Sequence, residues 1–125
     1  QYSGLGDVIG NAVSSASLPL VLVAFIVAAL VRICVGSATV AMTMAAGIVA
    51  AMPGISELSP LYLACVTAAV AGGATVCSHF NDSGFWLVKS LVGLDEKTNL
   101  KTWTIMETLV GGTGFLVALV ISCFA

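Results

Sequence analysis

Long apolar stretches alternate with short polar interruptions along most of the chain. Apolar side chains fill residues 18–35, 38–52, 60–77 and 105–125 with few exceptions, whereas residues 1–17 are mostly small and polar. Apolar runs of this length predict helices in a membrane, because a helix satisfies its own backbone hydrogen bonds in lipid. We therefore predict an all-α polytopic membrane protein, preceded by a loop or short interfacial segment.

The first two apolar segments are each too short for an ordinary membrane span. A transmembrane helix needs about 20 apolar residues, whereas each arm has roughly 16 and reaches about 24 Å. Only Gly36 and Ser37 separate the arms. We therefore predict a re-entrant helical hairpin over residues 18–52, with its tip near residues 34–39. Two tilted full spans are the alternative.

A run of polar residues interrupts the next apolar segment. Residues 60–88 predict a transmembrane helix that is broken at residues 78–84, where the sequence reads SHFNDSG. Before the break, Gly72 and Gly73 provide a face of small residues for close helix contact. Two breaks in one apolar chain indicate a transporter binding site, because the N–H ends of half-helices attract anions.

The last part of the chain predicts a surface segment followed by a span. Three of the four basic residues lie within residues 89–104, which predicts an amphipathic cytoplasmic segment by the positive-inside bias. Residues 105–125 then form the last transmembrane helix. We expect Glu107 to face the interface from the first turn of that helix, and Trp86 and Trp103 to belong to the interfacial aromatic belt.

The composition indicates that lipid is the main solvent. Hydrophobic residues make up 59% of the sequence and charged residues 8%, with a mean hydropathy of +1.12. Soluble domains carry about a quarter charged residues, so four basic and six acidic side chains cannot cover a water-facing surface. A net charge of −2 without a basic run argues against nucleic acid as a partner.

The cysteines and the single histidine match no metal or catalytic motif. No two of the four cysteines are spaced as CxxC, and each lies in or beside an apolar stretch: Cys34, Cys65, Cys77 and Cys123. We interpret all four as buried apolar residues and expect neither metal nor cofactor. A membrane-embedded enzyme would need a motif such as HExxH or GxSxG, and neither occurs.

Polar residues around the first break are candidates for binding an anion. At a re-entrant tip, Arg32 could pair with a substrate carboxylate through two hydrogen bonds; at the lipid interface it would be an anchor. Ser37 and Thr39 flank the tip. Their hydroxyls are suited both to capping a helix and to binding the hydroxyls of a polyol acid.

The second break holds two candidates for proton coupling, His79 and Asp82. Histidine titrates near neutral pH, and a carboxylate in a low-dielectric site can also carry a proton. The alternative is a polar pair that satisfies the ends of a broken helix. Asn81 and Ser83 are candidate amide and hydroxyl ligands, or turn residues.

Three segments resemble the gluconate permease family. Residues 30–41 (LVRICVGSATVA) are similar to the family's ALVR…GSATVA segment. Residues 78–86 (SHFNDSGFW) resemble SHVNDSGFW with Phe80 in place of Val, and residues 100–108 (LKTWTIMET) resemble LKTWTVMET. The three segments occur in the family's order and spacing, and cover roughly residues 18–110.

The resemblance implies a multi-pass symporter of the bacterial inner membrane that imports gluconate or a related sugar acid with protons. Family members are several times longer and contain two inverted repeats, so this chain would be the final part of the second repeat. It would then work only with the remaining N-terminal part; a homo-oligomer stays open. The matched positions that would line half of the site are Arg32, Gly36, Ser37, Thr39, Ser78, His79, Asn81, Asp82 and Ser83.

Two other functions stay open. The same class of transporter could carry D-serine or another small carboxylate, because an amino acid also presents a carboxylate and a hydroxyl. From another class, a small oligomeric channel or scaffold subunit would fit the apolar composition. Further hydrophobic spans upstream in the reading frame would remove the second alternative.

Overall fold

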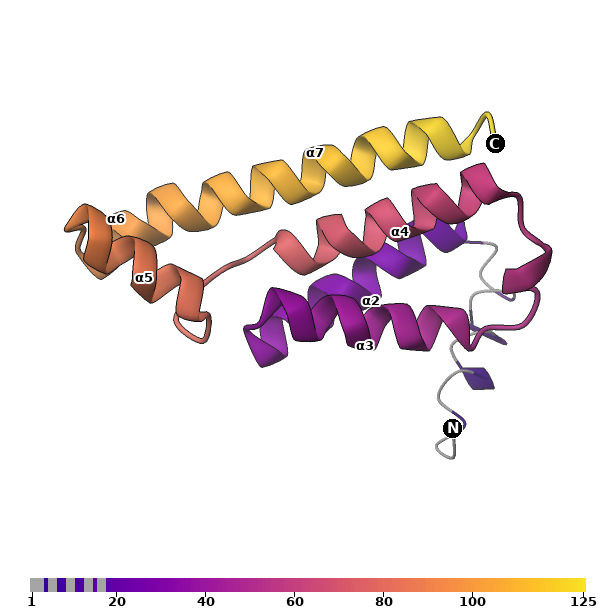
Figure 1. Cartoon of the computed structure of the whole chain (residues 1–125), viewed down its shortest axis with the longest axis horizontal. Helices are drawn as coiled ribbons and strands as arrows, with labels where there is room; N and C mark the ends of the chain where they lie inside the picture. The colour runs from indigo at the N-terminus through magenta and orange to yellow at the C-terminus, as the bar shows by residue number, and fades with distance from the viewer. Residues whose placement is uncertain (1–3, 5–6, 9–10, 13–14, 16–17) are drawn as a thin grey trace.

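The computed structural model describes residues 4, 7–8, 11–12, 15 and 18–125, and every regular element in this part of the chain is a helix. The all-α prediction is therefore confirmed. Most of the segment 1–17, expected to be a loop or interfacial, lies outside the described residues. In chain order, the elements in Figure 1 are α2 (Leu20–Val35), α3 (Ala38–Ala50), η1 (Ile55–Glu57), α4 (Pro60–Thr75), α5 (Ser83–Val92), α6 (Glu96–Asn99), η2 (Leu100–Thr104) and α7 (Ile105–Ser122).

Helices α2 and α3 run antiparallel and form a helical hairpin (Figure 1). Gly36 ends α2 with a φ of 82°, and its N–H donates to the Arg32 carbonyl. Glycine adopts this left-handed conformation without steric cost, which lets the chain reverse at once. The Ser37 hydroxyl then accepts the Val40 N–H at 3.4 Å and begins α3. The turn between the two helices is therefore very short.

Helix α4 packs against both α2 and α7 through positions that have almost no side chain. A Cβ on Gly73 would collide with the Phe25 carbonyl of α2, and a Cβ on Gly72 would lie 2.7 Å from the Gly111 carbonyl oxygen of α7. Small residues let helix backbones approach closely in a membrane. We call Gly72, Gly73 and Gly111 the glycine seam.

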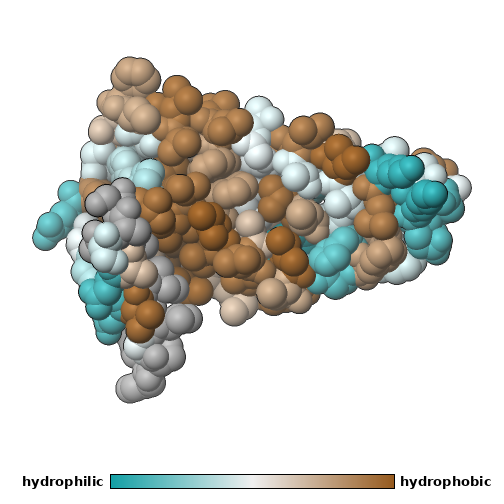
Figure 2. Space-filling view, turned by 180° about the vertical axis from the view of Figure 1, so that it is seen from behind, coloured by the Kyte–Doolittle hydropathy of each residue, from teal (hydrophilic) through white to brown (hydrophobic). Residues whose placement is uncertain are grey.

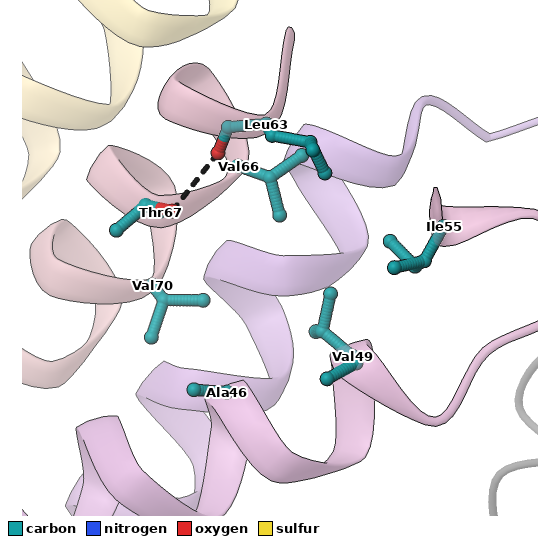
Figure 3. Close-up of a pocket in the computed structure, with 8 residues that line it drawn as sticks. Ala46, Val49, Ile55, Leu63, Val66, Thr67 and Val70 are labelled. Carbon is teal, nitrogen blue, oxygen red and sulfur yellow. Dashed lines mark hydrogen bonds between the residues drawn. The ribbon is translucent and has the colours of Figure 1, made fainter. Parts of the chain in front are cut away.

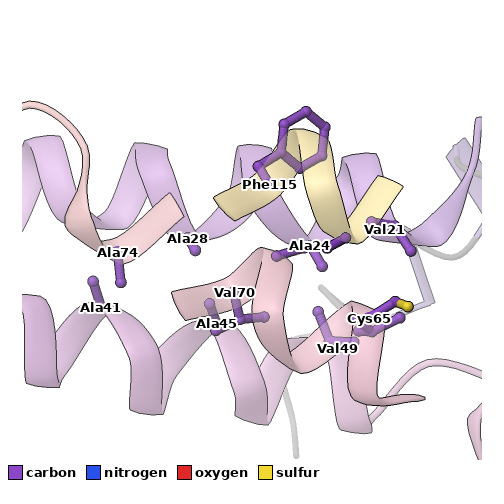
Figure 4. Close-up of a cluster of buried hydrophobic side chains, with 13 residues drawn as sticks. Val21, Ala24, Ala28, Ala41, Ala45, Val49, Cys65, Val70, Ala74 and Phe115 are labelled. Carbon is purple, nitrogen blue, oxygen red and sulfur yellow. The ribbon is translucent and has the colours of Figure 1, made fainter. Parts of the chain in front are cut away.

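Alanines and valines dominate the buried core beside this seam (Figure 4). Phe115 of α7 adds an aromatic ring, which stacks on Phe25 of α2 with 4.2 Å between ring centroids. Because the side chains are short, the helices lie close together and leave little room for polar groups. The core therefore positions the helices but offers no chemistry.

Residues Glu96–Ser122 form one continuous helix of 27 residues, because the π-helical turn η2 joins α6 to α7. Among the described residues, this is the one helix that is long and apolar enough to cross a membrane; α2, α3, α4 and α5 are shorter apolar helices. Glu107 therefore lies inside a helix. Glu107 lies in the first turn of α7, as expected, but this turn has no free N–H end, because the backbone stays helical through residues 100–104.

The surface of the bundle is largely apolar. Figure 2 shows hydrophobic side chains across its middle and hydrophilic residues toward both ends, including the end formed by α5 and α6. Large side chains such as Leu30, Leu109 and Leu116 are about three-fifths exposed. A water-soluble monomer rarely exposes apolar surface on this scale, so lipid or further protein covers this surface.

The cysteines are distributed differently from the prediction. Cys65 is buried and Cys77 half-buried, but Cys34 and Cys123 are exposed, and all four thiols are free. The prediction that all four are buried was therefore wrong for two of them. An apolar neighbourhood in the sequence does not distinguish a core-facing position from a lipid-facing one.

Candidate functional site

The tip of the α2–α3 hairpin lies against the interruption between α4 and α5. Residues 76–82 are non-helical, and we call this segment the polar break. Asn81 Nδ2 donates to the Ile33 carbonyl at 2.8 Å. A Cβ on Gly36 would collide with the backbone of Asn81, so only glycine allows this approach. The two interruptions, which are distant in sequence, therefore meet in space.

Arg32 and Asp82 form a buried ion pair where the interruptions meet. Arg32 Nη2 lies 2.6 Å from Asp82 Oδ2, and the two side chains are only 3% and 12% exposed. Arg32 Nη1 donates to the Gly36 carbonyl, while Asp82 Oδ1 accepts the Gly84 N–H at 3.0 Å and caps α5. Each charge is thus compensated by the other, as burial requires.

One nitrogen of the Arg32 guanidinium has no hydrogen-bond partner in the described chain. This nitrogen, Nε, is buried. A buried donor without a partner costs free energy, so this N–H is available to an acceptor that enters the site. His79, in the same break, likewise has a buried Nδ1 without a partner in the described chain.

The Ser78 hydroxyl connects Asp82 to the last helix. Ser78 is fully buried, and its Oγ donates to Asp82 Oδ2. The same oxygen accepts the indole N–H of Trp103 at 2.8 Å. The charged pair is therefore linked through one hydroxyl to η2, at the N-terminal side of α7.

Two threonines of the same helix satisfy backbone groups of the polar break. The Thr104 hydroxyl donates to the Ser78 carbonyl, and Thr108 Oγ1 accepts the Cys77 N–H at 3.1 Å. Residues four apart lie on one helix face, so these two hydroxyls face the break together. Their spacing was the available sequence signal, and the sequence reasoning assigned neither of them to the site.

Trp103 was also missed, because aromatic residues near the ends of apolar segments suggest an interfacial belt. Its indole N–H instead contacts the polar break. The other tryptophan, Trp86, donates from Nε1 to the Phe80 carbonyl at 2.7 Å. Both indoles thus hold the non-helical segment, but only Trp103 reaches the hydroxyl that contacts Asp82.

The nine residues predicted for the site divide into two groups. The structure places five of them at the contact between tip and break: Arg32, Gly36, Ser78, Asn81 and Asp82. The other four lie around it. The Ser37 hydroxyl caps α3, His79 is half-buried, and Thr39 and Ser83 are exposed.

A separate apolar pocket of about 240 Å³ lies between α3 and α4 (Figure 3). Thr67 supplies a hydroxyl to its lining, and that hydroxyl already donates to the Leu63 carbonyl at 2.9 Å. The remaining lining residues are Ala46, Val49, Ala50, Ile55, Val66 and Val70. Without a charged group this pocket is unsuited to an anion, so the ion pair marks the better candidate site.

The fold and the site together define an integral membrane protein with interrupted helices and a buried ion pair between them. Residues 1–124 match the family model of the GntP family permeases. The chain belongs to this family of transporters.

Individual relatives agree with this assignment. The low-affinity gluconate transporter of Escherichia coli is 44% identical over 120 residues, which are 94% of this chain and 26% of the relative. A gluconate permease of Pseudomonas aeruginosa is 41% identical (96% and 26%), and the Gnt-II system L-idonate transporter of Escherichia coli is 39% identical (96% and 27%). The chain thus spans about a quarter of the length of these curated relatives. No solved structure matches it significantly.

Proposed function

We propose that this chain is the C-terminal part of a proton-coupled symporter that imports gluconate or a related sugar acid across the bacterial inner membrane. The family assignment and the names of the relatives support a sugar-acid permease. The observation that carries the proton coupling is the buried Arg32–Asp82 pair at the meeting of two helix interruptions. It combines an anion-binding group with a proton-binding group.

In this proposal the α2–α3 hairpin is re-entrant. Its helices have 16 and 13 residues and reach about 24 and 20 Å, which is short of a hydrocarbon core of about 30 Å. Residues 60–88 form the broken span, residues 89–104 lie at the cytoplasmic surface, and residues 105–125 form the last span. The tip and the polar break then meet toward the cytoplasmic side of the membrane, because Trp103 and Thr104 of the surface segment bond to Ser78.

Arg32 is the proposed ligand of the substrate carboxylate. A planar guanidinium binds a carboxylate with two parallel hydrogen bonds, and its Nε donor is free to contribute one. Around it, substrate hydroxyls would contact the hairpin tip at Gly36, the amide of Asn81 and the nearby serine and threonine hydroxyls, those of Ser37, Thr39, Ser78 and Ser83.

Competition for Arg32 is the proposed basis of coupling. While Asp82 is ionised it holds the guanidinium at 2.6 Å, so an incoming carboxylate must displace another carboxylate. Protonation removes the charge of Asp82 and releases Arg32 for the substrate. Proton and anion therefore favour each other's binding, by the reciprocity of linked equilibria. His79 is the second candidate carrier, since its ring titrates near neutral pH.

The other half of the site, and the repeat against which this part moves, would come from the remaining N-terminal part of the transporter. Alternating access would then follow from one repeat moving against the other. The relative named as an L-idonate transporter favours sugar acids over the alternative substrate D-serine. A homo-oligomer is compatible with this arrangement.

The test is uptake of labelled gluconate by the full-length transporter in proteoliposomes, with and without an inward proton gradient. We expect gradient-driven uptake in the wild type and its loss in Asp82→Asn, which keeps the shape of the side chain. Exchange of labelled for unlabelled gluconate without a gradient should survive in this variant and serves as the control for folding.

Other outcomes would redirect the proposal. Gradient-driven uptake that survives in Asp82→Asn and disappears in His79→Gln would move the proton to His79. No gluconate uptake in the wild type would overturn the substrate assignment, and D-serine and other small carboxylates would then be tested in the same vesicles.

A further inference from the structure

We propose that Trp103 is a positioning residue for proton coupling and acts on Asp82 through the Ser78 hydroxyl. The inference rests on the proposed function, in which Asp82 is the group that takes up the proton. It adds a third residue, on the last helix, to the ion pair of the hairpin tip and the polar break.

The direction of this hydrogen-bond chain follows from the chemistry of its members. An indole N–H can only donate, so the Ser78 oxygen must accept from Trp103. The single hydroxyl proton of Ser78 is then free to point at Asp82 Oδ2. An ionised carboxylate can only accept. The chain Trp103 to Ser78 to Asp82 therefore ends on the charged form of Asp82 and stabilises that form.

Protonation of Asp82 disturbs this arrangement. A protonated carboxyl group accepts the Ser78 proton more weakly, because hydrogen bonds to an ionised acceptor are about twice as strong as neutral ones. The indole N–H polarises the hydroxyl and strengthens its bond to the carboxylate. Removing that N–H must therefore make protonation of Asp82 easier.

The π-helical turn η2 aligns Trp103 for this role. Two consecutive residues of η2 reach the same serine, since Trp103 donates to its hydroxyl and Thr104 to its carbonyl. Both bonds hold Ser78, which is fully buried. Single π-helical turns inside α-helices occur frequently at functional sites, and this one presents its donors to the residue next to the ion pair.

Other charged and titratable groups also act on Asp82. Arg32 of α2 pairs with it directly, and His79 lies in the same break. Glu107 is half-buried on α7, one residue before Thr108. All three remain when Trp103 is replaced by an uncharged aromatic residue. The change therefore isolates the hydrogen-bond chain from the charges.

The experiment compares two tryptophan-to-phenylalanine variants of the full-length transporter. Trp103→Phe removes the indole N–H that reaches Ser78, and Trp86→Phe is the matched control, because it removes an indole N–H that binds only the Phe80 carbonyl. The measurement is initial gluconate uptake in proteoliposomes as a function of external pH. The pH at which uptake is half-maximal (the midpoint) should rise by about 0.5 to 1 pH unit in Trp103→Phe. It should stay at the wild-type value in Trp86→Phe.

Ser78→Ala provides a second test that does not depend on Trp103→Phe folding. This variant removes the hydroxyl that connects Trp103 to Asp82, so the pH of half-maximal uptake must also rise. In the Ser78→Ala background, Trp103→Phe must then add no further shift. Equal shifts in the two tryptophan variants, an unmoved midpoint in folded Trp103→Phe, or additive shifts in the double variant would each overturn the inference.

Failure of the proposed function has a different signature. If Asp82→Asn keeps the wild-type pH profile, Asp82 carries no proton, and the proposed coupling fails whatever Trp103 does. If Asp82→Asn abolishes the pH dependence while Trp103→Phe leaves the wild-type midpoint, the coupling stands and only the role of Trp103 is overturned.

Discussion

The glycine seam and the polar break hold the same helices together in opposite ways. At the glycine seam side chains are absent, and the backbones of α4, α2 and α7 approach each other directly. At the polar break buried side chains fill the space and pair with one another, above all Arg32, Ser78 and Asp82. Where backbone hydrogen bonds are complete within helices, close packing is enough. Where the helix is interrupted, polar partners must replace them.

The two regions should therefore differ in which substitutions destabilise them. Substitutions at the glycine seam should destabilise the protein in proportion to the volume that they add. The polarity of the new side chain should matter little. The polar break should respond to the loss of a single partner, even when the volume hardly changes. The following predictions, which concern the stability of the full-length transporter in detergent, test this difference.

The largest effect is expected when one member of the ion pair is removed. Asp82→Ala leaves Arg32 charged and buried without its partner, and should lower the free energy of unfolding by about 3 to 5 kcal/mol. The double variant Arg32→Met/Asp82→Leu should recover most of this loss, since no buried charge remains. Chemical unfolding measures both. A double variant as unstable as the single one would contradict the argument from charge.

A smaller loss is expected from one added methyl group at the glycine seam. In Gly73→Ala the new Cβ collides with the Phe25 carbonyl, and overpacking of this kind costs about 1 to 3 kcal/mol. Gly47→Ala on α3 is the matched control, because no atom lies within 4 Å of its Cβ position. The control should be neutral or stabilising by up to about 1 kcal/mol. An equal loss of stability in the two variants would show that close packing at Gly73 does not stabilise the protein.

Loss of one hydrogen bond to the polar break should have a more modest effect. Thr108→Val leaves the Cys77 N–H without its acceptor and should cost about 1 kcal/mol. Thr113→Val, at an exposed position of α7, is the control of equal volume change. Thermal unfolding of the two variants side by side gives the comparison. If Thr113→Val is the more harmful change, α7 does not hold the break through this hydroxyl.

The smallest effect is expected at an ion pair with the same N–O distance as the buried one. Lys89 Nζ lies 2.6 Å from Glu96 Oε1, but the side chains are 25% and 51% exposed. Exposed pairs contribute little, because water and salt screen them. Glu96→Gln should therefore leave the unfolding midpoint unchanged at low and high salt. A loss that approaches that of Asp82→Ala would mean that burial does not decide the strength of such pairs.

The apolar helices and the two interruptions could be predicted because both depend on local sequence. Hydropathy along residues 18–125 identified the helical class, and Gly72 and Gly73 indicated a close helix contact. The continuity of the last helix was harder to predict. Lysines and threonines in residues 96–104 look like a surface segment, yet the backbone there remains helical through η2.

The sequence by itself determined the class of protein, the family and the positions of the two interruptions. Only the tertiary structure decided which side chains pair with one another at the interruptions. Arg32 and Asp82 are 50 positions apart, and Ser78 and Trp103 are 25 apart. Hydropathy and helix periodicity act over one or two turns, whereas these pairs depend on the angle and depth at which the helices pack. The glycine seam brings α4 close to α2 and α7, and the same two helices supply Arg32 and Thr108 to the polar break.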